Sequence, residues 1–342
     1  MRIRLGIIVA VIWVAAASSA PAIDTVKLTN ETKRGEVKSI DPVHVEVTIE
    51  GFDEKIPVNQ IVTIYFGSEP GSMRNARGHV GSGRYEDALE ILNGLNVPEL
   101  ALPVQQDVAF YKALCTARMA LAGNGDLMQA ARQMAGFLAS NTRSYHYLEA
   151  TEVMGDLAVA VGQHAKAEDY YATLAKAPWP DYKMRAGVAM GRARLAQNKI
   201  AEAAQAFDAV LGMSAAGDLA KAQQLAARLG KARCMAAEGQ SAQAIDAVKK
   251  ILANADTEDV ALHAQAYNTL GTAYRKSGQE NEAILAFLHV DILYYADRQS
   301  HAEALANLVE LWNKKMKTER AQEARTMLRE RYGNTRWAKQ AE

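Results

Sequence analysis

Residues 267–290 read YNTLGTAYRKSGQENEAILAFLHV, and this stretch decides the fold. Small residues at Gly271 and Ala283 would let two antiparallel helices approach closely, while Tyr267, Tyr274 and Phe287 would fill the space on either side. Related patterns recur, giving seven copies after residue 70. The residues equivalent to Gly271 follow one another at intervals of 36 to 41 residues. They are Ala76, Ala117, Gly155, Gly191, Ala232 and Trp312, of which Trp312, in the last copy, has a large side chain. The sequence therefore predicts a mainly α protein of about seven helical hairpins.

Together with Leu270, Gly278 and Val290, these residues occupy the signature positions of the tetratricopeptide repeat (TPR) family, which residues 71–342 resemble. One hairpin cannot bury its apolar face alone, so neighbouring hairpins must stack. The resemblance implies a right-handed α-solenoid whose first helices line a concave groove. It also implies that the groove binds a protein or peptide partner and that the chain is not an enzyme.

The first 22 residues have a different character. Two arginines lie within residues 1–4, residues 5–17 form an apolar run, and Ala20 and Ala22 flank Pro21 where a signal peptidase requires small residues. This pattern predicts a signal peptide at residues 1–22 and export to the periplasm or the extracellular space. The alternative is an uncleaved anchor, but a membrane span needs roughly 20 apolar residues. We expect no span in the mature chain, which would begin near Ile23.

Residues 23–70 change from helical to strand periodicity. Val43, Val45, Val47 and Ile49 alternate with polar residues, as expected for a strand with one buried face. Four or five such short strands suggest a small all-β barrel that resembles the Sm-like or SH3-like class. A segment of this size buries little surface, so we expect it to lean on the first repeat. It would act either as a cap on the solenoid or, given its excess of acidic residues, as a surface for a basic partner.

Composition and motifs exclude several classes of function. The 39 basic and 39 acidic residues balance, which argues against a nucleic-acid binder that relies on bulk positive charge. The seven histidines show no spacing typical of a zinc site, and no nucleophile motif or phosphate-binding glycine loop occurs. We therefore expect no catalytic residue, metal or cofactor.

Candidate binding residues come from the family resemblance. It implies that the residue after each small residue points into the groove, and four of these seven residues are arginines, whose planar donors suit carboxylates. The resulting groove residues, with two nearby arginines added, are Arg77, Arg118, Arg185, Arg192, Arg233, Thr272, Arg275 and Asn313. Asp156 occupies the same position in the third repeat. The arginines would either bind an acidic partner or form ion pairs with acids of the neighbouring repeat.

These observations predict a non-enzymatic scaffold of the cell envelope. It would bind partner proteins, including acidic segments of them, through its concave groove. The alternative is an accessory or regulatory subunit of an envelope enzyme or assembly complex.

Overall fold

The computed structural model describes residues 23–341 of the chain. The predicted signal peptide, residues 1–22, lies outside the described residues. The strands are β1 (Asp24–Leu28), β2 (Thr32–Ile40), β3 (His44–Ile49), β4 (Phe52–Pro57) and β5 (Ile61–Tyr65). The helices are α1 (Gly71–Gly81), α2 (Tyr85–Asn93), α3 (Leu102–Leu121), α4 (Leu127–Ser140), α5 (Tyr147–Ala160), α6 (His164–Leu174), α7 (Pro180–Ala196), α8 (Ile200–Leu211), α9 (Asp218–Ala237), α10 (Ser241–Asn254), α11 (Val260–Lys276), α12 (Glu280–Leu293), α13 (Arg298–Lys314), α14 (Thr318–Tyr332) and α15 (Arg336–Gln340).

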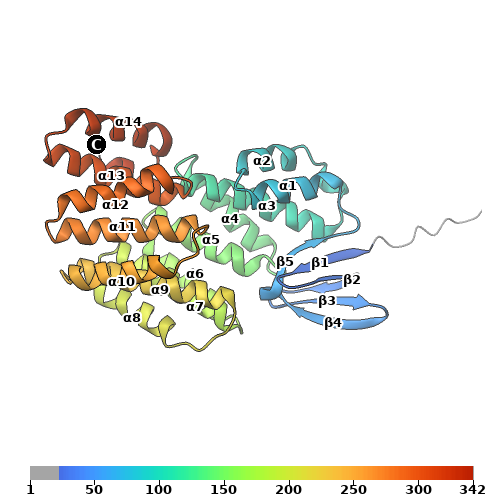
Figure 1. Ribbon diagram of the computed structural model, residues 1–342. Coiled ribbons are helices and arrows are strands. Elements are labelled where there is room, and N and C mark those ends of the chain that lie inside the picture. The colour runs from blue at the N-terminus through green and yellow to red at the C-terminus, as the bar shows by residue number, and fades with distance from the viewer. Residues whose placement is uncertain (1–22, 342) are drawn as a thin grey trace, which may run out of the picture.

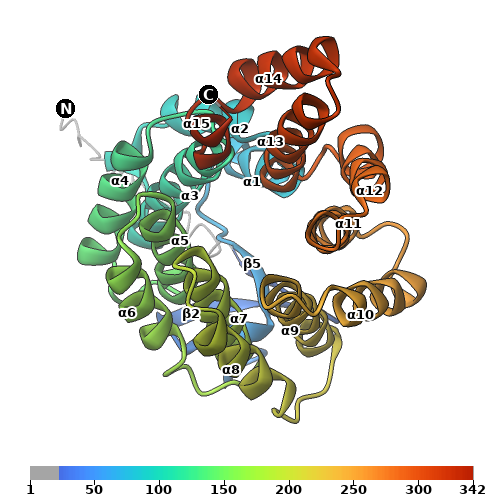
Figure 2. The same ribbon diagram turned by 90° about the vertical axis from the view of Figure 1, so that its left-hand side faces the viewer.

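Within the described residues, α1 to α14 form seven helical hairpins, which confirms the predicted solenoid. Each hairpin packs on the next, so the array curves around a central axis (Figures 1 and 2). In Figure 2 the chain runs counter-clockwise from α1 to α13 while it advances towards the viewer, which is a right-handed path. The first helix of each hairpin lies on the inside of this superhelix, and the second lies on the outside.

The predicted register of the repeats is also confirmed. Gly271 faces the ring of Phe287, and a methyl group on Gly271 would lie only 2.7 Å from that ring. Ala283 is fully buried in the same hairpin. In the fourth hairpin, Asn198 replaces the usual turn glycine and adopts a left-handed conformation with φ of 59°, as an asparagine can. Close helix contact in the hairpin of Gly271, and in those of Gly155 and Gly191, therefore arises where the repeat pattern places a small residue.

The five strands form one antiparallel sheet in the order β4-β3-β2-β1-β5. The long strand β2 bends, because its first half pairs with β1 and its second half pairs with β3. Among the described strand pairings none joins β4 to β5, so these two edge strands are not paired with each other. The small all-β unit is therefore a curved sheet with two free edges.

The sheet and the first hairpins share one apolar core. Val26, Val45 and Ile64 belong to the same buried cluster as Met73 of α1 and Phe110 of α3. A polar contact extends the junction further along the chain, since the Asn59 side chain donates to Asp181 of α7 at 3.2 Å. The expected support from the first repeat is thus wider than predicted. The sheet lies against several consecutive hairpins (Figure 1).

The C-terminal end of the superhelix meets the second hairpin at a contact that we call the seam, formed by residues 332–335 and 123–125. Asn334 donates its side-chain amide to the carbonyl oxygen of Gly125 at 3.3 Å, although the two residues are 209 positions apart. Gly123, at φ of 86°, lies so close to Tyr332 that a methyl group would come within 3.0 Å of its Cα. The turn between α3 and α4 is two residues longer than the turns of the other hairpins, and it contacts the turn that follows α14. The seam thus closes the superhelix into a ring-like shape.

Candidate functional site

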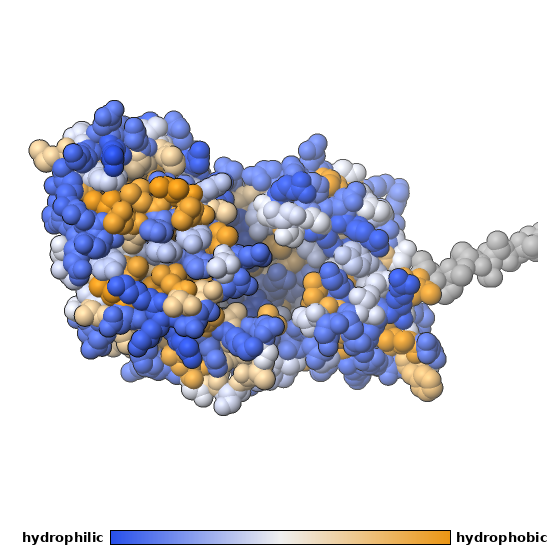
Figure 3. All heavy atoms as spheres, in the orientation of Figure 1, coloured by the Kyte–Doolittle hydropathy of each residue, from blue (hydrophilic) through white to orange (hydrophobic). Residues whose placement is uncertain are grey.

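The inner surface of the superhelix is narrow. Arg192 of α7 donates to Gln265 of α11 at 3.1 Å, and Arg233 of α9 pairs with Glu303 of α13. Each of these contacts joins hairpins that are two steps apart in the array. Figure 3 shows a hollow between the C-terminal hairpins and the N-terminal half of the molecule. A ligand on the inner surface would therefore touch several hairpins at once.

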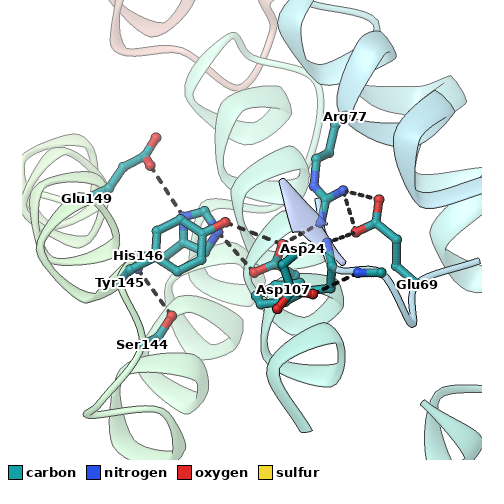
Figure 4. A network of polar contacts seen from close by, with 10 residues as sticks. Asp24, Glu69, Arg77, Asp107, Ser144, Tyr145, His146 and Glu149 are labelled. Atoms are coloured by element: carbon teal, nitrogen blue, oxygen red, sulfur yellow. Dashed lines mark hydrogen bonds and ion pairs between the residues drawn. The ribbon is translucent and has the colours of Figure 1, made fainter. Parts of the chain in front are cut away.

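Arg77 does not belong to this exposed surface. Its guanidinium donates to Glu69 at 2.8 Å and to Asp107 at 2.6 Å, and the three side chains are almost completely buried. The guanidinium also lies over the ring of Tyr65, 5.4 Å from its centroid. Figure 4 shows Arg77 on one side of this buried polar network, between Glu69 and the central Asp107. Its role in the structure is to hold the strand segment against α1 and α3.

The same network reaches the loop before α5. Tyr145 donates its hydroxyl to Asp107 at 3.4 Å, and a ring nitrogen of His146 lies 3.3 Å from the other carboxylate oxygen (Figure 4). Burial alone would lower the pKa of His146, but its contacts with Asp107 and Glu149 outweigh burial and raise it. Burial raises the pKa of Glu69 despite the contact with Arg77. The network therefore contains buried groups that change charge with pH.

Three other predicted arginines form ion pairs with acids on other hairpins. Arg185 pairs with Glu152, and Arg275 pairs with Glu310. Arg233 pairs with Glu303 across two hairpin steps. For these positions the structure shows the intramolecular pairing that the sequence left open. The pairs leave part of each arginine accessible, because all three arginine side chains are between 28% and 32% exposed.

Arg118 and Arg192 differ from the other candidates. Within residues 23–341 neither arginine forms an ion pair, and the polar contact described for Arg192 is the one to the neutral Gln265. Arg192 is exposed to solvent and Arg118 is half-buried. These two arginines are the cations of the predicted set that are left to bind an external anion.

The remaining two candidates are neutral. Thr272 is half-buried on α11, and Asn313 is exposed near the end of α13. Neither side chain takes part in the hydrogen bonds described for residues 23–341. They can contribute hydrogen bonds to a ligand but no charge.

Sequence reasoning placed Asp156 on the inner surface but did not identify its contacts, and it missed Arg336. Asp156 accepts a hydrogen bond from the Tyr171 hydroxyl at 2.8 Å and lies within electrostatic range of Arg118 and Arg192. At the C-terminal end, Arg336 of α15 lies near enough to Arg233 for their charges to interact. The repeat pattern places Asp156 on the inner surface, but α15 lies outside the repeats, so the pattern gave no signal for Arg336.

Between residues 23 and 341, no cluster of three or more histidine, cysteine or acidic side chains could hold a metal ion. Both cysteines, Cys115 and Cys234, are buried free thiols whose pKa values burial raises. None of the helices in this part of the chain is long and apolar enough to cross a membrane.

Comparison with solved structures agrees with this geometry. A tetratricopeptide repeat protein from Parabacteroides merdae superposes with a TM-score of 0.52 at 17% identity, covering 79% of this chain and 97% of that chain. The chain has the tetratricopeptide repeat fold. A Rap protein, solved in complex with competence and sporulation factor, also gives a TM-score of 0.52, at 13% identity, with 79% and 75% of the two chains covered. No protein-family model and no curated protein matches the TPR chain by sequence.

Proposed function

We propose that this TPR protein is a non-enzymatic scaffold that binds a segment of a partner protein on the inner surface of its superhelix. The observation that carries the proposal is the presence of Arg118 and Arg192 on that surface without an ion pair to any of the residues 23–341. An unpaired guanidinium offers planar donors that suit a carboxylate, and a charge-assisted hydrogen bond is stronger than a neutral one. The partner segment is therefore acidic or bears a carboxylate.

The shape of the inner surface supports a segment rather than a globular face as the bound group. The contact between Arg233 and Glu303 spans two hairpin steps and narrows the available space. An extended segment suits this surface, because it can run along the inner helices and reach both Arg118 and Arg192. The Rap neighbour, which was solved with a bound factor, shows that this fold is compatible with a bound molecule.

We further propose that the scaffold works in the cell envelope after removal of residues 1–22. The basic start, the apolar run and the small residues around Pro21 support this part of the proposal. Mass spectrometry of the protein from its native host should find an N-terminus near Ile23. Recovery of the intact N-terminus on the purified protein would contradict the envelope location.

A copurification experiment tests the binding site. The double variant Arg118→Gln/Arg192→Gln should lose the partner that the wild-type protein captures from envelope extracts. A matched control is Arg132→Gln/Arg329→Gln, which removes the same charge from exposed positions on outer helices. The control should retain the partner. Equal capture by all three proteins would refute the inner-surface site, and the identity of the captured protein would distinguish a free-standing scaffold from an accessory subunit of an enzyme or assembly complex.

A further inference from the structure

A carboxylate of the protein itself lies between the two unpaired arginines. Asp156 is on α5, and α5 stands between α3, which carries Arg118, and α7, which carries Arg192 (Figure 2). The charges of both arginines act on Asp156. Three adjacent inner helices therefore present a positive, a negative and a positive charge in turn.

A hydrogen bond holds the Asp156 carboxylate in place, and no ion pair with the described residues competes with the two arginines for its charge. The hydroxyl of Tyr171, on α6, donates to one carboxylate oxygen at 2.8 Å. Glu152, one turn earlier on α5, also acts on Asp156 and is paired with Arg185, and Glu149 of the same helix acts on Arg118. Asp156 is half-buried and has no ion pair of its own within residues 23–341.

We propose that Asp156 is the specificity-determining residue of the inner surface, because its negative charge opposes a partner carboxylate that approaches Arg118 and Arg192. This inference rests on the proposed function and states what regulates the same site. When Asp156 is ionised, the three side chains carry a net charge of about +1. When it is neutral, they carry about +2, and an acidic segment is attracted more strongly.

The charge of Asp156 changes within an accessible pH range. Burial, with a smaller contribution from Glu152, raises its pKa to about 6. The aspartates of a flexible peptide have pKa values of about 4 and stay ionised at pH 5.5. Lowering the pH from 7.5 to 5.5 therefore neutralises Asp156 and leaves the ligand charged, so binding should tighten as the pH falls.

The experiment uses a rhodamine-labelled peptide of ten aspartates, with binding followed by fluorescence anisotropy. Asp156→Asn keeps an acceptor for Tyr171 and removes the charge, so it should bind the peptide about three- to tenfold more tightly than wild type at pH 7.5. Wild type should gain a similar factor between pH 7.5 and 5.5, and the variant should show almost none. Asp246→Asn, an exposed change on the outer helix α10, is the control with the same charge difference and should behave like wild type.

The outcomes separate this inference from the proposed function. If the wild-type affinity is the same at both pH values, or if Asp156→Asn keeps the wild-type pH dependence, the inference is overturned. If Asp156→Asn and wild type bind equally while Arg118→Gln/Arg192→Gln does not bind, the inference fails and the proposed function stands. If the double arginine variant binds as tightly as wild type, or if the peptide binds to none of the proteins, both are overturned.

Discussion

Removing the positive charge from the buried network should cost much of the stability of the protein. In Arg77→Met, the carboxylates of Asp107 and Glu69 would lose the guanidinium that donates to both. Their side chains are 1% and 7% exposed, so water cannot replace it. Breaking a buried ion pair in this way costs about 3–5 kcal/mol, against a total stability of roughly 5–15 kcal/mol. We expect the variant to be folded only marginally at pH 7.

A matched variant separates burial from charge. Arg275→Met also breaks an ion pair between hairpins, but its partner Glu310 is 62% exposed, so the expected loss is about 0–1 kcal/mol. Urea denaturation of both variants gives the two free energies of unfolding. Trp179, which packs against the shared core, makes fluorescence sensitive to the region around Arg77. If the free energy of unfolding falls by the same small amount in both variants, the network does not hold the sheet to the solenoid.

Three further predictions concern packing, the seam and pH. Gly271→Leu should cost roughly 1–3 kcal/mol, since the new side chain would overlap the Phe287 ring; an unchanged melting temperature would contradict the repeat register. Gly123→Val should speed hydrogen exchange around the seam, because its φ of 86° strains a β-branched residue and Tyr332 leaves no room; unaltered exchange would show that the seam is not closed in solution. The pKa of His146 is raised in the folded state, so protonated His146 stabilises the fold. This stabilisation is complete below pH 6.5, the unfolded-state pKa, and is lost as the pH rises through the folded-state pKa. His146→Gln should therefore lose more stability, relative to wild type, at pH 5.5 than at pH 8.5, and an equal loss at both values would refute this assignment.

The fold was predictable where it depends on contacts close in sequence. The pairing of Gly271 with Phe287 joins residues 16 positions apart, within one repeat, so a repeating pattern encodes it. The turn at Asn198 is likewise local, because a left-handed residue is required there and asparagine tolerates it. The alternation of valines in β3 identified a strand, but its partners β2 and β4 carry polar, mostly exposed residues and gave a weaker signal.

The roles of the arginines depend on the curvature of the superhelix, which no single repeat specifies. Equivalent positions in the repeats predict that Arg77, Arg192 and Arg233 share an environment. Arg77 is instead buried, because the sheet and its linker add Glu69 at the N-terminal end of the array. Arg233 meets Glu303, which the curvature brings from 70 positions away, whereas Arg192 donates to the neutral Gln265.

The seam explains why the second repeat departs from the others. Residues 123–125 read Gly-Asn-Gly and exceed the usual turn of a hairpin, which in the sequence is only an irregularity. In the structure, Gly123 packs against the backbone of Tyr332, and the Gly125 carbonyl oxygen accepts a hydrogen bond from the Asn334 amide. A side chain at Gly123 would prevent this close approach. An irregular repeat is therefore not a degenerate one. It marks the place where the C-terminal end of the array contacts the second hairpin, and this contact joins residues 209 positions apart.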